Sequence, residues 1–352
     1  MKIPFFIQEF TDEMEEAAIY ALRNESFVGG ERVSKFEEEF ARYTGTKYAA
    51  SVSSGNGALQ ISLMALGIGK SHEIITPTNS FIASANCIRM TNAKPILTDI
   101  DMNDGGIDLS NIKNNVNGII PVYIYGNPCN FDSVKSFAEV QNIPIIEDAC
   151  QAHGAEYKGK KVGSLGDVGC FSFYPTKNMT VGGDGGMTTT DNEEIVIKIK
   201  SIRDNGRKTK NEFDKLGFTM RLNTVNAAIG RVQLRHLDEK TKRRREIVSI
   251  YKKNLAEDCI LPENKDGKSV YHQIVIKHEK RDAIREELRN NDIGSAIYYE
   301  TPIHQQEIYQ DYGLKLPKSE KFSKLILSLP SYPQLTDEQA LEICEYVNKV
   351  IG

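Results

Sequence analysis

The chain has few cysteines and histidines, and neither type is spaced as a metal site requires. None of the six cysteines forms a C-x-x-C pair. Structural zinc and iron–sulfur sites usually draw their ligands from such pairs. The six histidines show no H-E-x-x-H or similar spacing. We therefore predict no metal site and interpret the cysteines as small, buried, reduced thiols.

Long apolar runs and an excess of positive charge are also missing. No run approaches the roughly 20 apolar residues that a membrane-spanning helix needs. The formal net charge is −4, whereas a nucleic-acid binder usually carries a clustered basic excess. The N-terminal segment MKIPFFIQEFTDEMEE becomes acidic too soon for a signal peptide. These features predict a cytoplasmic protein that binds neither membranes nor nucleic acids.

A chain of 352 residues is long enough for one large and one smaller domain. Short apolar runs alternate with helical patterns between about residues 50 and 200. The seven candidate strands are Tyr48–Val52, Glu73–Thr76, Pro95–Asp99, Gly118–Tyr125, Pro144–Glu147, Val168–Tyr174 and Gly186–Thr190. Such alternation favours an α/β fold with a mainly parallel seven-stranded sheet covered on both faces. Ligands bind beyond the carboxyl ends of strands in sheets of this kind.

The pattern changes after a long predicted helix at Asn226–Arg245, whose basic end KTKRRR we interpret as a solvated face. A strand and two helices are predicted beyond it, at Val270–Lys277, Lys280–Asn290 and Thr336–Ile351. We therefore predict a large domain at residues 1–240 and a smaller α+β domain at residues 241–352.

Two helices are predicted before the sheet. Thr11 is placed to cap the first helix. Ser34 is placed to cap the second, with Glu37 three residues later as a capping box requires.

A glycine-rich segment, residues 53–57 (SSGNG), directly precedes the predicted helix Ala58–Leu66. The start of a helix exposes unpaired N–H groups and the positive end of the helix dipole. It therefore attracts anions, and glycines let a phosphate approach the backbone. Taken alone, the segment is better explained as a tight turn.

Two acidic residues, Glu147 and Asp148, follow a buried apolar strand. A buried carboxylate is costly unless it is paired or hydrogen-bonded. The protonated nitrogen of a pyridine ring would be such a partner for Asp148. A helix N-cap explains Asp148 equally well from this stretch alone. His153 is either a structural histidine or a group that supports Asp148.

A third cluster follows the strand at Val168–Tyr174. Ser172 offers a hydroxyl to a phosphate, and Pro175 ends the strand just before Lys177. Lysine forms imines with aldehydes when its site lowers its pKa, although an exposed surface lysine is the simpler explanation of any single one. The glycine-rich turn at Gly182–Gly186 indicates close approach of the backbone to another group.

Together these features resemble the DegT and StrS type of nucleotide-sugar aminotransferases, which have the aspartate aminotransferase fold (fold type I). The resemblance extends along nearly the whole chain. The ordered matches include Ser54-Gly55, Asp99-Ile100-Asp101, Glu147-Asp148, Gln151-Ala152-His153-Gly154, Phe171-Ser172-Phe173 with Lys177, and Leu327-Ser328-Leu329-Pro330.

The resemblance implies pyridoxal 5'-phosphate (PLP/PMP) as cofactor, Lys177 as the lysine that forms the Schiff base, and Asp148 as the partner of the pyridine nitrogen. It implies that Gly55 and Asn56 donate backbone N–H groups to the phosphate. Further implied cofactor contacts are the phosphate ligand Ser172, the stacking residue Phe81, and Gln151 near the phenolic oxygen or beside the ring.

Two departures from the family pattern bear on the site. The family usually has Gly-Thr or Gly-Ser where this chain has Gly55-Asn56. A Gly-Tyr-Asn stretch, whose asparagine reaches the phosphate held by the partner subunit, is replaced by Gly217-Phe218-Thr219. Thr219 is the cofactor-binding candidate there, with a shorter side chain. The resemblance implies a homodimer whose active sites are shared between the subunits.

The implied activity is transfer of an amino group from an amino acid, expected to be L-glutamate, to a nucleoside-diphosphate-linked keto-hexose. Two alternatives within the family are a PLP/PMP-dependent sugar dehydratase and a non-catalytic, ligand-sensing relative. Dehydratases of the family carry histidine at the lysine position, whereas Lys177 is present here. The sequence leaves open whether C3 or C4 is aminated and which nucleotide is used. It also leaves open whether basic residues such as Arg203 and Arg207 meet a diphosphate or solvent.

Overall fold

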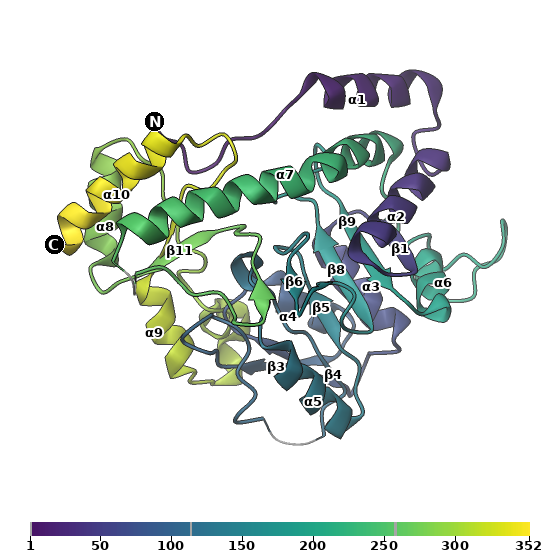
Figure 1. The fold of residues 1–352 in the computed structure, drawn as a ribbon. Coiled ribbons are helices and arrows are strands. Elements are labelled where there is room, and N and C mark those ends of the chain that lie inside the picture. Colours follow the sequence, from purple (N-terminus) through teal and green to yellow (C-terminus); the bar gives the residue numbers. More distant parts are fainter. Residues whose placement is uncertain (1, 113–114, 257–258) are drawn as a thin grey trace.

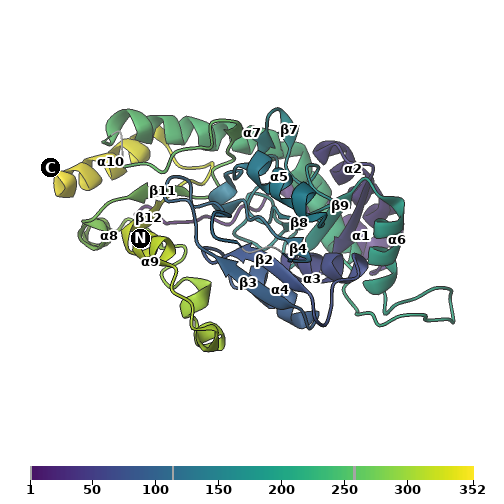
Figure 2. The same ribbon diagram turned by 90° about the horizontal axis from the view of Figure 1, so that it is seen from below.

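The structure is a computed structural model that describes residues 2–112, 115–256 and 259–352. Helices and strands alternate through the first half of the chain, and helices lie around the strands (Figures 1 and 2). The long helices are α1 (Asp12–Asn24), α2 (Glu31–Thr44), α3 (Gly55–Ala65), α4 (Ala83–Met90), α5 (Phe131–Gln141), α6 (Glu193–Ile202), α7 (Thr224–Asn254), α8 (Arg281–Asn290), α9 (Pro317–Leu325) and α10 (Asp337–Ile351).

Each of the seven predicted strand regions contains a strand. They are β1 (Tyr48–Val52), β2 (Glu73–Pro77), β3 (Lys94–Thr98), β4 (Gly118–Ile119), β5 (Ile146–Asp148), β8 (Val168–Ser172) and β9 (Gly186–Thr190). They form two sheets, with strand orders β1-β9-β8-β5 and β3-β2-β4. Strand β9 is antiparallel to both of its neighbours, whereas β5–β8, β2–β3 and β2–β4 are parallel. The α/β class is confirmed, but the single, mainly parallel seven-stranded sheet needs correction.

Prolines explain why the two sheets are separate. Between β4 and β5 only isolated parallel bridges form. Pro121 and Pro144 lie at this junction and lack an N–H group, so they contribute carbonyls alone. Ile119 N donates to Pro144 O at 3.1 Å, and Asp148 N donates to Pro121 O at 2.9 Å. These bonds align β5 with β4 without completing a hydrogen-bonded ladder.

The N-terminal helices begin differently from one another. The Thr11 hydroxyl accepts a hydrogen bond from Met14 N at 3.3 Å, so the predicted cap of α1 is confirmed. The predicted cap at Ser34 is wrong, because α2 begins at Glu31 after Gly30. Glu37 lies on the buried face of this helix and cannot serve a capping box.

Instead, Glu37 joins α2 to β1 and to the end of α6. Arg203 Nη1 donates to Glu37 Oε1 at 2.5 Å and to Ser51 O at 2.6 Å. Ser51 N also donates to Glu37 Oε1, at 2.9 Å. Arg203 is thus held inside the fold by its own chain, which excludes it from the basic residues open to a diphosphate.

Helix α7 continues without a break through residue 240 and packs in two separate apolar clusters (Figure 1). We call the parts of the molecule around these two clusters the large lobe and the C-terminal lobe. Leu234 and Leu237 pack in the apolar cluster around β8 and α2. Ile247 and Val248 pack in a second cluster with α8 and α10. The C-terminal lobe also contains the antiparallel strands β11 (Ile274–Lys277) and β12 (Ile326–Leu329).

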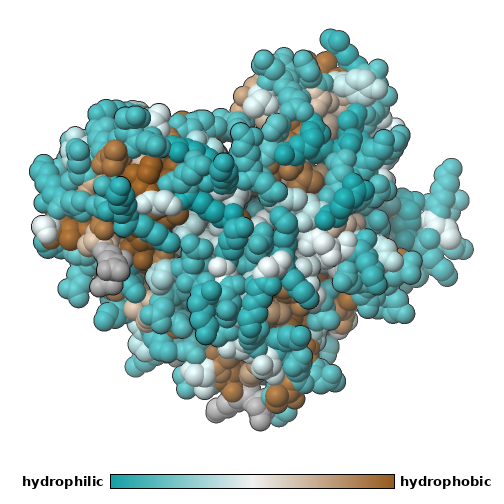
Figure 3. All heavy atoms as spheres, viewed as in Figure 1, coloured by the Kyte–Doolittle hydropathy of each residue, from teal (hydrophilic) through white to brown (hydrophobic). Residues whose placement is uncertain are grey.

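Most of the face seen in Figure 1 is covered by hydrophilic residues, with apolar side chains in smaller areas (Figure 3). None of the helices in the described ranges is long and apolar enough to cross a membrane. The largest fully buried side chains are aromatic or branched aliphatic, and they include Tyr123, Tyr251, Phe36 and Phe171.

Candidate active site

A cavity of about 510 Å³ lies where the starts of α3 and α4 meet the carboxyl ends of β5 and β8. It contains all but one of the cofactor-site residues expected from the sequence. These are Gly55, Asn56, Phe81, Asp148, Gln151, Ser172 and Lys177. The C-terminal lobe contributes His272, Gln273, Tyr298 and Tyr299 to its wall. The position agrees with the expected ligand site beyond strand ends.

The start of α3 forms one wall of the cavity. Ser54 caps the helix, since its Oγ accepts a hydrogen bond from Gly57 N at 3.0 Å. The N–H groups of Gly55 and Asn56 lie in the first turn, where a helix offers them no acceptor. A Cβ at Gly55 would lie 2.5 Å from Ser172 Cβ, so only glycine fits beside Ser172. The result is a cradle of donors for a phosphate group.

Glu147 and Asp148 point to opposite sides of β5, as neighbouring strand residues do. Glu147 is fully buried within the large lobe, and its carboxylate is surrounded by donors of its own chain. They are Gly163 N at 2.7 Å, Gly166 N at 2.7 Å, Leu165 N at 2.8 Å and Tyr123 OH at 2.8 Å. Burial nevertheless raises the pKa of Glu147 above its ordinary value. Glu147 is therefore a structural carboxylate.

Asp148 faces the cavity instead. Its Oδ2 accepts a hydrogen bond from Ser84 Oγ at 2.7 Å, and its Oδ1 accepts one from Cys150 N at 3.2 Å. No helix follows Asp148 directly, so the N-cap alternative does not apply. Within residues 2–112, 115–256 and 259–352, no lysine or arginine forms an ion pair with this carboxylate. Asp148 thus retains acceptor capacity for a cationic group in the cavity.

His153 does not support Asp148. Its ring is fully buried between Phe171 and Phe173, with ring centroids 5.5 and 5.8 Å away. Neither ring nitrogen has a hydrogen-bond partner in the described part of the chain. Burial, reinforced by the charge of Lys177, lowers the pKa of His153 to about 3. This histidine is a neutral part of the core.

Lys177 enters the cavity from the turn after β8, where its backbone N donates to Tyr174 O at 2.8 Å. Burial lowers the pKa of the Lys177 amine below its ordinary value, while Cys150 and Asp148 oppose this shift. A lowered pKa increases the fraction of neutral amine, which is the form that attacks a carbonyl carbon. Burial therefore shifts this amine toward its nucleophilic form.

Gln151 connects the two lobes at the cavity. Its Oε1 accepts a hydrogen bond from Tyr125 N at 2.7 Å, and its Nε2 donates to Tyr299 OH at 3.2 Å. Tyr125 OH donates to Tyr298 O at 2.5 Å. The ring of Tyr299 lies 6.1 Å from that of Phe81, which is 56% exposed and therefore open to a stacking ligand.

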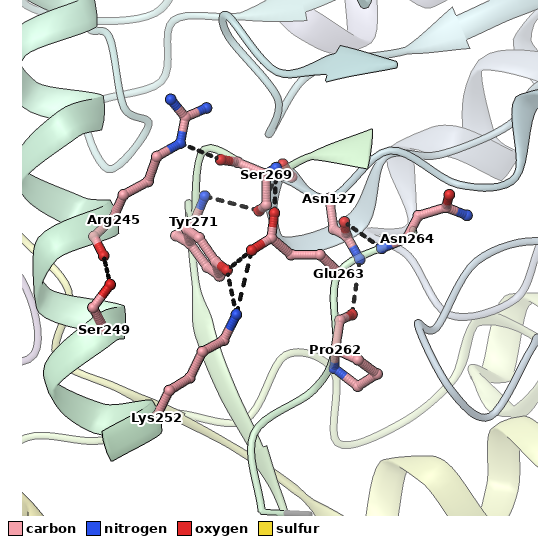
Figure 4. A network of polar contacts seen from close by, with 10 residues as sticks. Asn127, Arg245, Ser249, Lys252, Pro262, Glu263, Asn264, Ser269 and Tyr271 are labelled. Atoms are coloured by element: carbon pink, nitrogen blue, oxygen red, sulfur yellow. Dashed lines mark hydrogen bonds and ion pairs between the residues drawn. The ribbon is translucent and has the colours of Figure 1, made fainter. Parts of the chain in front are cut away.

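A polar network around Tyr271 holds another segment of the C-terminal lobe (Figure 4). Tyr271 OH donates to Glu263, while Lys252 Nζ donates to Tyr271 OH at 3.0 Å and to Glu263 Oε1 at 3.3 Å. Tyr271 has a φ of 47°, in the left-handed region that L-residues rarely adopt. The network stabilises this turn, which brings His272 and Gln273 to the cavity wall.

Thr219 is the expected site residue that the structure does not place in the cavity. Its side chain is exposed, and its hydroxyl donates to Asn205 Oδ1 at 3.1 Å. The flanking backbone is fixed against the end of α6, because Phe218 N donates to Ile202 O at 2.7 Å. Thr219 therefore cannot serve the cofactor site of its own chain.

The cavity also contains residues that were not predicted from the sequence, among them Ser80, Ser84 and His272. Ser84, in the first turn of α4, lies four residues after Ser80, and this spacing was the one available sign that both hydroxyls share a face. His272 reaches the cavity from the other lobe, which local sequence patterns do not reveal.

Comparison with known proteins identifies the family. Residues 8–348 match the DegT/DnrJ/EryC1/StrS aminotransferase family. The chain belongs to this family. The expectation drawn from the sequence motifs is confirmed.

Two curated relatives show how widely this sequence pattern is shared. The chain is 36% identical to UDP-N-acetyl-3-dehydro-alpha-D-glucosamine 3-aminotransferase of Acidithiobacillus ferrooxidans, covering 94% of this chain and 91% of the relative. It is also 36% identical to the pleiotropic regulatory protein of Geobacillus stearothermophilus, covering 93% of this chain and 91% of the relative.

The fold is shared with solved structures. The crystal structure of S. venezuelae DesV in complex with a ketimine intermediate superposes with a TM-score of 0.93 at 32% identity, covering 96% of this chain and 94% of DesV. The PMP form of Spr1654 from Streptococcus pneumoniae superposes with a TM-score of 0.91 at 26% identity, covering 99% of this chain and 98% of Spr1654.

Proposed function

We propose that this protein is a PLP-dependent aminotransferase that moves an amino group from an amino acid, expected to be L-glutamate, to a nucleoside-diphosphate-linked keto-hexose. The observation that carries the proposal is one cavity that contains Lys177, Asp148 and the donor-rich start of α3. Those three features meet the separate needs of an aldehyde, a ring nitrogen and a phosphate.

The residues present fit the cofactor. The first-turn N–H groups of Gly55 and Asn56, with the Ser172 hydroxyl, would hold its phosphate. The exposed ring of Phe81 would stack on one face of its ring, and Lys177 would hold it covalently. When bound, PLP supplies the electron sink that allows amino transfer.

Lys177 and Asp148 divide the remaining work. Lys177 would take a proton from the donor's α-carbon as the base and would then return it as the acid. The direction of its pKa shift, which burial causes, favours the neutral amine that a base requires. Asp148 would accept a hydrogen bond from the protonated ring nitrogen and so hold that proton in place. Gln151, fixed by Tyr125 and Tyr299, orients the ring edge.

The names of relatives support the substrate class. One relative acts on UDP-N-acetyl-3-dehydro-alpha-D-glucosamine, and another is a GDP-perosamine synthase. A sugar dehydratase is disfavoured by Lys177 in the cavity. A ligand-sensing role is the second candidate, because one relative carries the name of a regulatory protein. The complete Lys177–Asp148 pair favours catalysis over that role.

We also propose a cytoplasmic homodimer. Thr219, exposed and outside its own cavity, would lie near the phosphate held by the partner subunit. The lobes would divide near residue 240 within α7, since Leu237 and Ile247 pack in separate apolar clusters. The two sheets, aligned through the bridges beside β5, would act together as the seven-stranded platform of fold type I.

The experiment is to incubate the purified, PLP-loaded protein with L-glutamate and a panel of nucleotide-linked keto sugars, followed by mass spectrometry. An aminated sugar together with 2-oxoglutarate is the expected result. A deoxygenated sugar would identify a dehydratase. Tight sugar binding without turnover across the panel would identify a sensor.

A further inference from the structure

Two buried serines form a hydrogen-bonded chain that ends on Asp148. Ser80 precedes α4 and Ser84 lies in its first turn, four residues later, and both line the cavity. The two hydroxyl oxygens are 2.7 Å apart, and Ser84 Oγ lies 2.7 Å from Asp148 Oδ2. Ser80 and Ser84 are only 4% and 1% exposed, so water does not compete freely for these contacts.

The direction of this chain is fixed by chemistry. A hydroxyl has one hydrogen, and an ionised carboxylate only accepts. The hydrogen of Ser84 therefore goes to Asp148 Oδ2, and Ser84 must accept from Ser80. The backbone N of Cys150 donates to the other carboxylate oxygen at 3.2 Å. One donor on each oxygen fixes the plane of the carboxylate and leaves its remaining lone pairs to one partner in the cavity.

We propose that Ser84, backed by Ser80, is a positioning residue that aims Asp148 at the ring nitrogen of the cofactor. This inference rests on the proposed function. The serines touch neither the reacting carbon nor the amino group. They act through Asp148, because a carboxylate held on both oxygens keeps one direction. Truncating Ser84 would leave Asp148 with one donor and free to rotate.

The test compares Ser84→Ala with Ser62→Ala. Ser62 is an equally buried serine whose hydroxyl donates to Ala58 O at 2.7 Å, on the helix that carries the phosphate cradle. The readouts are PLP affinity, the pH dependence of the bound cofactor's absorbance, and the single-turnover rate with L-glutamate. Losing a hydrogen bond to a charged group should weaken affinity and rate by about 10-fold to 100-fold in Ser84→Ala. Its pH profile should shift relative to Ser62→Ala, and Ser84→Thr should restore most of the loss.

Ser84→Ala values equal to those of Ser62→Ala would overturn the inference. If Ser84→Ala does not fold, Ser80→Ala decides, since it removes the donor behind Ser84 without touching Asp148. A smaller loss in the same direction then supports the chain, and wild-type affinity and pH profile contradict it. The proposed function fails separately, if the wild-type protein binds no PLP or gives no single turnover with any amino acid.

Discussion

Glu147 and Asp148 are neighbours on one strand, yet they occupy two different kinds of region. On the Glu147 side, the loop at residues 163–166 and Tyr123 OH supply donors to both carboxylate oxygens. On the Asp148 side, one serine and one backbone N–H leave acceptor capacity facing a cavity. A buried carboxylate saturated by its own chain stabilises the fold, whereas one left incomplete awaits a ligand.

Replacing Lys177 is the most severe test of this comparison, because Lys177 faces the same cavity as Asp148. Lys177→Ala should reduce the rate of amino transfer by about 10²-fold to 10⁴-fold or more, because it removes acid–base catalysis together with the covalent link. Single-turnover kinetics with L-glutamate would measure this. Lys161→Ala, at a partly exposed lysine that pairs with Asp238, is the control. Near-normal turnover in Lys177→Ala would sink the catalytic assignment.

Isosteric amides at the two carboxylates should separate the two regions directly. Asp148→Asn should lower the single-turnover rate by about 100-fold or more, since an amide cannot stabilise the ring-nitrogen charge. Glu147→Gln should instead lower the free energy of unfolding by about 1–3 kcal/mol, because its NH₂ faces N–H donors. Urea unfolding and single-turnover kinetics on both variants test this. The comparison is contradicted if both variants change the same quantity equally.

The buried His153 predicts that the stability of the fold decreases in acid. His153 has a pKa of about 3 in the fold against 6.5 as the ordinary value. Between these values the unfolded chain binds one more proton than the folded chain, so stability falls with acidification in this window. The slope is about 1.4 kcal/mol per pH unit for one such group. His153→Phe should flatten the fall in urea midpoint between about pH 6 and pH 4. An unchanged slope would mean that the low pKa of His153 contributes nothing to the dependence of stability on pH.

The smallest effect is expected at Tyr299, which the C-terminal lobe contributes to the cavity that Asp148 faces. Tyr299→Phe removes the hydroxyl that accepts from Gln151 and should raise the KM for the keto sugar by about 3-fold to 10-fold. Tyr298→Phe is the matched control, because Tyr298 is held through its backbone carbonyl. Equal KM values for the two variants would show that the Tyr299 hydroxyl does not contribute to binding of the keto sugar.

Much of the fold was predictable because its patterns are local. The apolar runs predicted each of the seven strand regions. The cap at Thr11 was predictable because it depends on one hydrogen bond between residues three apart. Ser34 failed as a cap because α2 already begins at Glu31 after Gly30, and a buried contact with Arg203, far apart in the chain, occupies the Glu37 carboxylate. The division into two sheets followed from prolines at the junction between strands, whose effect depends on which strands become neighbours.

The sequence by itself determined the chemistry of the site: a lysine after a strand, an aspartate at a strand end and a glycine-rich helix start, in an order that resembles a known family. Tertiary structure decided which groups complete it. Strand alternation turned Asp148 toward the cavity, and the position of α4 placed Ser84 on its carboxylate. Packing of the lobes added Tyr299, whereas contacts with Asn205 and the end of α6 hold Thr219 outside. Those choices depend on contacts between distant segments, which local patterns do not specify.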